Sequence, residues 1–224
     1  MRAHFITATG TDIGKTWLTC ALIAHWRTLG LRPQAFKPVL SGFDPAQAAA
    51  SDAGRILQAL GRPLAMATLD AIAPWRFAAP LSPDMAAGIE GRRIDFAALV
   101  DFTRRAAGET VGEMPVLVEG VGGAMAPLDE THTVRDWIAA SGLPCVLLAG
   151  SYLGSLSHTL SAWAALEKVG VGVTAIMVNE SPGTPVSLAA SAESLRRHVG
   201  GVPVLTVARA APAVGVAALA ALLG

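Results

Sequence analysis

The sequence is poor in charged residues, and it has no excess of charge of either sign. Only 15% of its 224 residues are charged and 52% are apolar, which excludes an intrinsically disordered chain. Lys and Arg total 17 and Asp and Glu also total 17, so the formal net charge is zero. Nucleic-acid binding draws on clustered positive charge, and the sequence has neither a basic balance nor a long Lys/Arg run. We therefore expect no nucleic-acid partner.

Cysteine is scarce and histidine shows no metal-binding pattern. The only cysteines, Cys20 and Cys145, lie far apart in apolar surroundings, which favours buried thiols over a zinc or redox pair. The five histidines have no metal-ligand spacing either. These shortages leave no sign of a zinc centre or of a Cys/His nucleophilic device.

Long hydrophobic runs are also missing. A membrane-spanning helix needs about 20 consecutive apolar residues. The longest candidate, residues 210–223, is shorter and is interrupted by Pro212 and Gly215. The first ten residues reach polar and glycine positions too early for a signal peptide. The sequence predicts a cytoplasmic protein with no membrane partner.

Short apolar runs alternate with longer amphipathic stretches. We expect strands over residues 4–8, 34–37, 116–119, 145–149, 173–178 and 203–207. We expect helices over residues 16–29, 51–60, 95–107, 134–140, 157–169 and 187–199, and in the Ala-rich tail. This alternation predicts an α/β fold with a mostly parallel sheet covered by helices on both faces, in a single domain over residues 1–224. Residues 71–91 are rich in proline and read as a loop or lid.

A glycine-rich segment joins the first predicted strand to the first predicted helix. It reads Ala-Thr-Gly-Thr-Asp-Ile-Gly-Lys-Thr over residues 8–16. In such a loop backbone N–H groups cradle phosphates, Lys15 reaches the β and γ phosphates, and the Thr16 hydroxyl ligates Mg²⁺. The first glycine of the usual motif is replaced, because Thr9 or Ala8 stands at its position. An ordinary turn with a surface lysine is the alternative, but the strand–helix context favours a P-loop NTPase-like nucleotide site.

Acidic residues follow two other predicted elements. Glu119 ends the apolar run 116–119 and precedes a glycine-rich turn, where a carboxylate would face the same edge of the sheet as the phosphate loop. Asp52 begins a predicted helix, and it is either a second Mg²⁺ ligand or a helix cap, a role that Ser51 fits as well. Residue types alone leave both alternatives open for Asp52.

Three polar residues follow strands at the same edge. Lys37 ends the second predicted strand and is suited to stabilise charge on a transferred group, with Ser41 close behind it. Asn179 follows the run 173–178, and its amide suits either the edge of an adenine ring or a turn. Four tryptophans fall in helical patterns and are predicted to lie in the core or an interface: Trp17, Trp26, Trp137 and Trp163.

Together these segments resemble the dethiobiotin synthetase family. The matching stretches are TATGTDIGKT (7–16), KPVLSG (37–42), SDA (51–53), APWRFAAPLSP (73–83), VLVEGVGGAMAPL (116–128), DW (136–137), LPCVLL (143–148), LGSLSH (153–158) and VNE (178–180). The likeness covers about residues 4–180 and keeps one order. The phosphate loop alone is shared by many nucleotidases, whereas the combination of segments is far more specific.

The resemblance implies a particular reaction. In this family 7,8-diaminopelargonate and CO₂ form a carbamate on one amine, and the carbamate attacks the γ phosphate of MgATP. The second amine then displaces phosphate from the mixed anhydride and closes the ureido ring, giving dethiobiotin, ADP and phosphate. A weak anionic nucleophile that attacks an anionic phosphate needs Mg²⁺ and lysines to offset the repulsion.

The resemblance also implies roles for individual residues. Lys37 and Lys15 are the implied catalytic residues, and Thr16, Asp52 and Glu119 the implied Mg²⁺ ligands. The implied nucleotide-binding residues are Asp12, Ile13, Gly14, Lys15, Thr16, Trp17, Asp52, Glu119, Gly120, Val121, Gly122 and Asn179. The implied substrate-binding residues are Thr11, Lys37, Ser41, Gly122, Gly154, Ser155 and Ser157. Because the family is homodimeric, the last three are expected to reach a neighbouring subunit's ligand.

Two other classes compete with this interpretation. A partitioning-type ATPase switch carries an additional lysine early in its phosphate loop, and residues 7–13 contain none. A non-catalytic nucleotide-binding sensor module would not need Lys15, Thr16, Lys37 and Glu119 together. The sequence therefore favours the enzyme.

Overall fold

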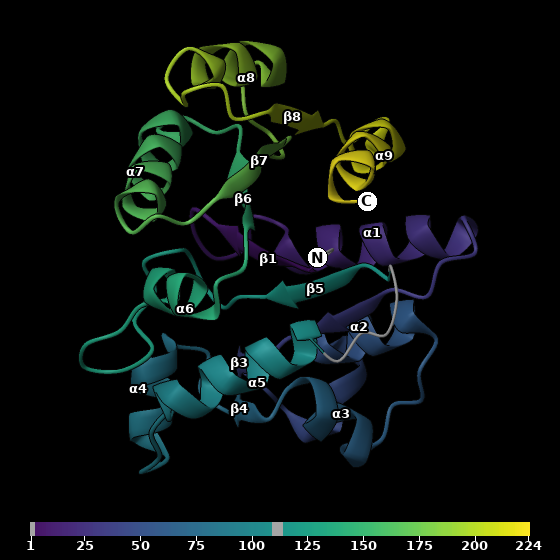
Figure 1. Ribbon diagram of the computed structural model, residues 1–224, viewed down its shortest axis with the longest axis vertical. Helices are drawn as coiled ribbons and strands as arrows, with labels where there is room; N and C mark the ends of the chain where they lie inside the picture. The colour runs from purple at the N-terminus through teal and green to yellow at the C-terminus, as the bar shows by residue number, and fades with distance from the viewer. Residues whose placement is uncertain (1–2, 109–113) are drawn as a thin grey trace.

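A six-stranded parallel sheet forms the centre of the molecule. The computed structural model describes residues 3–108 and 114–224. Its strands are β1 (Ala3–Ala8), β2 (Gln34–Phe36), β5 (Val116–Glu119), β6 (Cys145–Gly150), β7 (Val173–Asn179) and β8 (Val204–Val207), in the order β2-β5-β1-β6-β7-β8. Every pairing between them is parallel. The predicted α/β fold with a parallel sheet is confirmed (Figure 1).

Helices cover both faces of this sheet. They are α1 (Lys15–Thr28), α2 (Asp52–Leu60), α3 (Met66–Ile72), α4 (Pro83–Ile89), α5 (Phe96–Gly108), α6 (Val134–Ser141), α7 (Ser155–Lys168), α8 (Leu188–Arg196) and α9 (Pro212–Leu223). A 3₁₀ helix, Pro45–Ala50, precedes α2. Helices α1 and α9 lie on one side of the sheet, and α6 and α7 lie on the other (Figure 1). None of the helices in the described ranges is long and apolar enough to cross a membrane.

The central strands β1, β5 and β6 are buried on both faces, so they show no polar alternation. In β1, Phe5 contributes to the core beneath α5, α6 and α7, whereas Ile6 contributes to the core beneath α1, α2 and α9. In β6, Leu147 packs in the same core as Phe5, and Leu148 packs in the same core as Ile6. The two-residue period sends neighbouring apolar side chains to opposite faces. This double burial explains why continuous apolar runs predicted the strands correctly.

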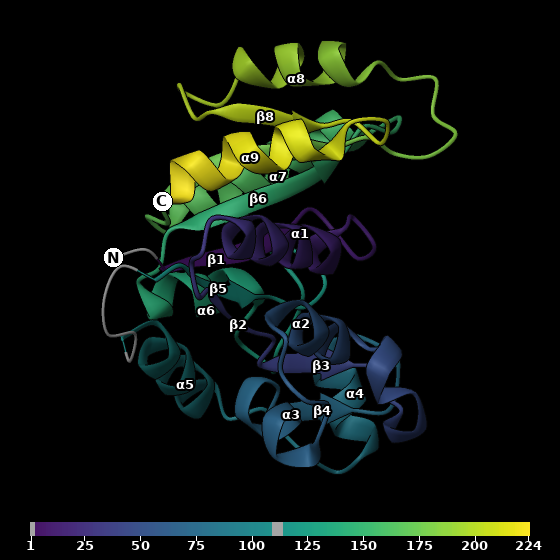
Figure 2. The same cartoon turned by 90° about the vertical axis from the view of Figure 1, so that its right-hand side faces the viewer.

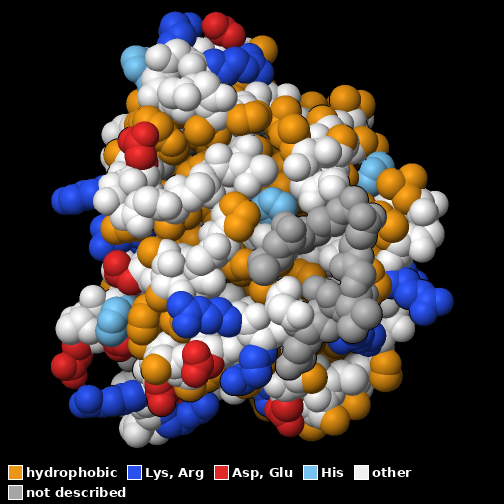
Figure 3. Space-filling model, in the orientation of Figure 1, with side chains coloured by type: hydrophobic (Ala, Val, Ile, Leu, Met, Phe, Trp, Pro, Cys, Tyr) orange, Lys and Arg blue, Asp and Glu red, His pale blue; other side chains and the backbone are white. Residues whose placement is uncertain are grey.

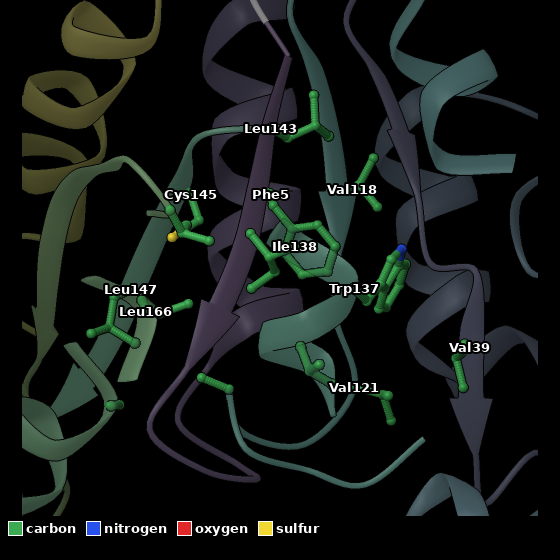
Figure 4. Packing of buried hydrophobic residues seen from close by; sticks show 14 of the residues in the cluster. Phe5, Val39, Val118, Val121, Trp137, Ile138, Leu143, Cys145, Leu147 and Leu166 are labelled. Atoms are coloured by element: carbon green, nitrogen blue, oxygen red, sulfur yellow. The ribbon is translucent and has the colours of Figure 1, made fainter. Parts of the chain in front are cut away.

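Trp137 anchors the core on the α6 side. Its ring meets the Phe5 ring edge to face at a centroid distance of 4.7 Å, and its Nε1 donates to Thr103 Oγ1 over 2.9 Å. Figure 4 shows Trp137 and Ile138 of α6 packed beside Phe5 and Val118. Burial of the indole is therefore accompanied by a partner for its N–H group. The predictions that Trp26 and Trp137 are core residues are confirmed.

The prediction of a loop over residues 71–91 is wrong. This segment contains the end of α3, a strand β4 (Trp75–Phe77) and α4. Strand β4 pairs in parallel with β3 (Val39–Ser41) to make a second, two-stranded sheet, which lies beside α2 and α4 (Figure 2). Strands of three residues show too little periodicity to be recognised. Pro83, taken as a loop signal, occupies the first turn of α4, where a fixed φ favours the helix.

We expect any side chain at Gly54 of α2 to destabilise the fold for a steric reason. A Cβ at this position would collide with the carbonyl oxygen of Ala48 and lie 2.9 Å from the Ala49 Cα. Gly54→Ala should therefore lower the free energy of unfolding by about 1–3 kcal/mol in urea denaturation, despite alanine's higher helix propensity. Gly88→Ala in α4 is the matched control, since a Cβ there meets nothing within 4 Å. Equal stabilities for the two variants would contradict the prediction.

Candidate active site

A large pocket opens at the carboxyl ends of β1 and β5. Its volume is about 720 Å³. The phosphate loop forms one wall, the turn after β5 forms another, and the segment before α4 forms a third. Its lining residues are Thr9, Gly10, Thr11, Asp12, Gly14, Lys15, Thr16, Trp17, Lys37, Leu40, Ser41, Asp52, Arg55, Pro80, Leu81, Ser82, Pro83, Val121, Gly122, Gly123, Met125 and Ala126. We refer to it as the phosphate pocket.

The phosphate loop has the backbone that the motif predicts. Gly14 adopts a φ of 101° at the N-cap of α1, and a Cβ there would lie 2.7 Å from Asn179 Nδ2. Asp12 has a φ of 58°, which makes it the one non-glycine residue of the described chain with positive φ. Such left-handed residues turn successive N–H groups inward, and the amino end of α1 adds partial positive charge. The loop is shaped for an anion.

The replaced first glycine does not alter this geometry. Ala8 lies inside β1, fully buried and without positive φ, and its carbonyl accepts from Ala124 N over 2.8 Å. Close approach is needed instead at Gly123, where a Cβ would lie 3.0 Å from the Thr9 carbonyl oxygen. The glycine run after β5 therefore packs directly against the phosphate loop.

Glu119 is the buried centre of the site. It has no exposed surface. Its Oε1 accepts from Thr16 Oγ1 over 2.6 Å and from Lys37 Nζ over 2.7 Å, and its Oε2 accepts from Thr19 Oγ1 over 2.7 Å. A buried carboxylate is tolerated only when it is paired and hydrogen-bonded, and both oxygens here have donors.

Lys37 bridges the two carboxylates. Its Nζ lies 2.7 Å from Glu119 and 3.2 Å from Asp52, and it also donates to the Gly120 carbonyl oxygen. Burial by itself would lower the pKa of Lys37, but the charges of Glu119 and Asp52 outweigh it and raise that pKa. The two carboxylates therefore favour the charged ammonium form of Lys37 at the edge of the phosphate pocket.

The structure separates the two roles considered for Asp52. Ser51 is the N-cap of α2, where its side chain accepts from Gly54 N. Asp52 is the first residue of the helix, and its carboxylate faces Lys37 instead. Burial favours the neutral acid, but Lys37 and the Thr16 hydroxyl outweigh burial and lower the pKa of Asp52. Asp52 is thus a charged site residue rather than the cap.

The oxygen atoms gathered here fit a magnesium ion. A hydroxyl and two carboxylates, from Thr16, Asp52 and Glu119, are hard donors of the kind that Mg²⁺ prefers. In the described ranges no group of three or more His, Cys, Asp and Glu side chains could hold a metal alone.

A second pocket of about 350 Å³ adjoins the first. Asp12, Gly14 and Trp17 line both pockets, and Asn179 lines the second one. Asn179 Nδ2 donates to the Ile13 carbonyl over 2.8 Å, whereas its Oδ1 is buried and has no partner in the described part of the chain. Such an orphaned acceptor invites a donor from a ligand. We call this cavity the Asn179 pocket.

Trp17 differs from the expectation of a core or interface residue for the helical tryptophans. Its side chain is 44% exposed and borders both pockets. Trp17 lies in the first turn of α1 beside the pockets, whereas its neighbour Leu18 is buried in the core. Its membership of the implied nucleotide-binding set agrees with this position.

Most of the other predicted site residues meet in these two pockets. Thr11, Ser41, Val121 and Gly122 line the phosphate pocket, and Ile13 lines the Asn179 pocket. Gly154, Ser155 and Ser157 line neither, since they lie at the start of α7, beyond β6. Gly120 is buried behind the site, where a Cβ would lie 2.8 Å from the Phe5 ring.

Sequence reasoning missed several residues of the site. Arg55 lines the phosphate pocket one turn beyond Asp52, and Met125 closes another side, together with residues 80–83 of the segment read as a loop or lid. Thr19, one turn beyond Thr16, was missed as well. A three-residue spacing on a helix places side chains on one face, and that spacing was the available signal for Arg55 and Thr19.

Comparisons with known proteins agree with this site. The model of a family described as an AAA domain matches residues 2–212. A protein of Acidiphilium cryptum named ATP-dependent dethiobiotin synthetase BioD is 52% identical over 208 residues, 91% of each chain. A protein of the same name from Phenylobacterium zucineum is 43% identical over 211 residues, 93% of this chain and 89% of that protein.

Solved structures show the same fold at low sequence identity. The MinD cell division protein of Aquifex aeolicus superposes with a TM-score of 0.58 at 11% identity, covering 99% of this chain and 94% of that chain. The hydrogenase maturation factor HypB of Archaeoglobus fulgidus gives 0.57 at 11% identity, covering 99% and 90%. These likenesses confirm the fold and leave the activity to other evidence.

Lys15 should make the ligand-free protein less stable. Burial, followed by repulsion from Lys37, lowers the pKa of Lys15 to about 8, against 10.5 for the free side chain. At pH 7 the folded protein therefore holds a disfavoured charge, and Lys15→Met should raise the free energy of unfolding by about 3 kcal/mol.

The contribution of Lys15 to folding stability should change with pH in a defined direction. Between pH 8 and pH 10.5 the unfolded chain binds more protons at Lys15 than the folded chain, so wild-type stability rises with pH. The advantage of Lys15→Met in urea denaturation should shrink across that interval. Lys168→Met, at the exposed end of α7, is the control and should show no such convergence. A constant difference between wild type and Lys15→Met would refute the assignment.

Proposed function

Because this chain belongs to the family of ATP-dependent dethiobiotin synthetases, we propose that its two adjoining pockets carry out that family's reaction. The enzyme is an ATP- and Mg²⁺-dependent ligase of biotin biosynthesis that converts 7,8-diaminopelargonate and CO₂ to dethiobiotin. The assignment of catalytic roles to individual residues rests on the placement of Lys37. Its charged side chain is buried beside the phosphate loop, between Glu119 and Asp52.

The triphosphate would lie in the phosphate loop. Its anionic oxygens would meet the inward N–H groups, the amino end of α1 and the Lys15 ammonium. Among the described residues Lys15 Nζ donates to the Gly10 carbonyl over 3.1 Å and to no other group, so its remaining donors are available for phosphate. Mg²⁺, held by Thr16, Asp52 and Glu119, would neutralise charge on the phosphates during transfer.

Lys37 would hold the reacting carbamate. A carbamate is an anion, and it must approach a second anion, the γ phosphate, before a bond can form. An ammonium fixed at that point offsets the repulsion, and because Glu119 and Asp52 keep it charged and oriented, little reorganisation is required. No general base is needed for the carbamate itself, because its attacking oxygen is already anionic.

The remaining contacts would orient the two substrates. Ser41 Oγ is buried without a partner in the wall of the phosphate pocket and would bind the diamine, together with Thr11. The orphaned Asn179 Oδ1 would accept from the exocyclic amine of adenine in the Asn179 pocket. Trp17 borders both cavities, so the base and the phosphates would lie on either side of it.

The two competing functions are not favoured. The resemblance to MinD is a resemblance of fold at 11% identity, whereas relatives of matching length at 43–52% identity are named synthetases. A sensor module would have no use for the buried Lys37, which must be paired by two carboxylates to remain charged. On the face drawn in Figure 3, charged side chains of both signs are interspersed.

The quaternary state and the location follow from the same proposal. The start of α7, which includes Gly154, Ser155 and Ser157, lines neither pocket of its own chain, and we assign it to the site of a second copy. The enzyme would then be a homodimer of single-domain subunits. It would work in the cytoplasm, where ATP is available.

Replacing Lys37 should abolish synthesis. With MgATP, bicarbonate and 7,8-diaminopelargonate, wild type should form dethiobiotin, detected by mass spectrometry. Lys37→Gln should lower kcat by about 100- to 1,000-fold, the usual effect of losing a preorganised electrostatic contact. Lys168→Gln should retain activity, and calorimetric binding of ATP should verify that the Lys37 variant is folded. Absence of product from wild type at saturating diamine would overturn the proposed function.

Leu153 should be needed for the dimer. It is 90% exposed, directly before Gly154. Leu153→Asp should shift the sedimentation coefficient to that of a monomer and abolish dethiobiotin formation, while ATP binding survives. Val214→Asp in α9, also an exposed apolar position, should remain dimeric and active. A monomeric wild type with full activity would contradict the assignment of residues 153–157 to a neighbouring site.

A further inference from the structure

Thr19 lies outside every predicted contact set, yet it touches the centre of the site. Its side chain is fully buried, and its hydroxyl donates to Glu119 Oε2 over 2.7 Å. The other oxygen of Glu119, Oε1, accepts from Thr16 and Lys37. Among the described residues Thr19 is the one donor to Oε2, so that oxygen has no substitute if the hydroxyl is lost.

The two threonines form a clamp on the carboxylate. Thr16 and Thr19 are three residues apart on α1, so their hydroxyls project from one face of the helix. Each bonds a different oxygen of Glu119, which extends from the end of β5. Two bonds to two oxygens fix the plane of a carboxylate, whereas one bond leaves it free to rotate.

From this geometry we propose that Thr19 is a positioning residue, which holds Glu119 so that Oε1 faces Lys37 and the magnesium site. This inference rests on the proposed function. Thr19 does not line the phosphate pocket and touches no reacting atom; it acts through Glu119. The bond joins the phosphate-loop helix to the end of β5, where Glu119 shares Lys37 with the second carboxylate, Asp52.

The informative substitution is Thr19→Val. Valine keeps the branched shape and removes the hydroxyl, leaving Glu119 Oε2 buried without a donor. The loss of a hydrogen bond to a charged group is large enough to weaken Mg²⁺ binding by about 10- to 100-fold, if Glu119 must be held in place for the ion to bind. We expect the Mg²⁺ concentration for half-maximal activity to rise about 10-fold or more in Thr19→Val, and Thr19→Ser to stay within about 3-fold of wild type.

A binding measurement separates positioning from damage to the fold. Calorimetric titration with a non-hydrolysable ATP analogue should give affinities within about 2-fold of wild type for Thr19→Val without Mg²⁺, since the loop backbone holds the phosphates. With Mg²⁺ the same variant should lose most of the gain in affinity that wild type shows.

Thr103→Val is the matched control for stability. Thr103 is fully buried, and its hydroxyl accepts from Trp137 Nε1, far from the site in α5. Its loss should lower the unfolding temperature without moving the Mg²⁺ dependence of either assay. If Thr19→Val behaves like Thr103→Val, the positioning role is refuted. If wild type forms no dethiobiotin but its analogue binding still depends on Mg²⁺ and on Thr19, the proposed function fails and the positioning role survives.

Discussion

The ion pair between Lys37 and the buried carboxylate of Glu119 is the interaction on which the site depends. Neither charge is stable at this depth alone, because removing one partner leaves the other unpaired in a medium of low polarity. The pair joins the segment after β2 to the end of β5, and Asp52 extends it to α2. Three segments distant in sequence are thereby held at one edge of the sheet.

A charged Lys15 lowers the stability of the ligand-free fold at the phosphate loop but makes that loop ready to bind an anion. Lys15 is mostly charged near neutral pH, although burial and the repulsion from Lys37 both disfavour its charged form. A bound triphosphate would stabilise that charged form, because its negative charge would lie beside the ammonium. Lys37, by contrast, is stabilised by carboxylates before any ligand arrives. The carboxylates of Glu119 and Asp52 thus outweigh burial at Lys37, whereas at Lys15 burial and the repulsion from Lys37 outweigh them.

Much of the fold was predictable because its central strands are buried on both faces. Continuous apolar runs marked β1, β5, β6 and β7, and the phosphate loop lay where a strand passes into a helix. Strands β3 and β4 were not predicted, since three residues carry no readable period and their pairing joins distant segments. The proline that suggested a loop at residue 83 begins a helix instead.

The site was predictable where a residue ends a strand, and less so where helices contribute. Glu119 and Asn179 follow from their position at strand ends. Asp52 remained ambiguous because a helix start suits a cap and a ligand equally, and only the Ser51 bond to Gly54 separates the two roles. For Thr19 the helical spacing from Thr16 placed the hydroxyl on the right face of α1, but its partner is a carboxylate one hundred residues away, which no local pattern names.

The two pockets adjoin at the phosphate loop and share lining residues from it. Gly14 lines both, and a side chain at that position would collide with Asn179, whose amide holds the Ile13 carbonyl. Asn179 also ends β7, and nearby Ser181 exchanges two 3.0 Å hydrogen bonds with Ser151, just before the start of α7. The segment assigned to a neighbouring subunit is therefore tied to the Asn179 pocket by two bonds, and the phosphate loop is tied to the same pocket by one. The end of β7 is thus linked by hydrogen bonds both to the phosphate loop, through Asn179, and to the segment before α7, through Ser181.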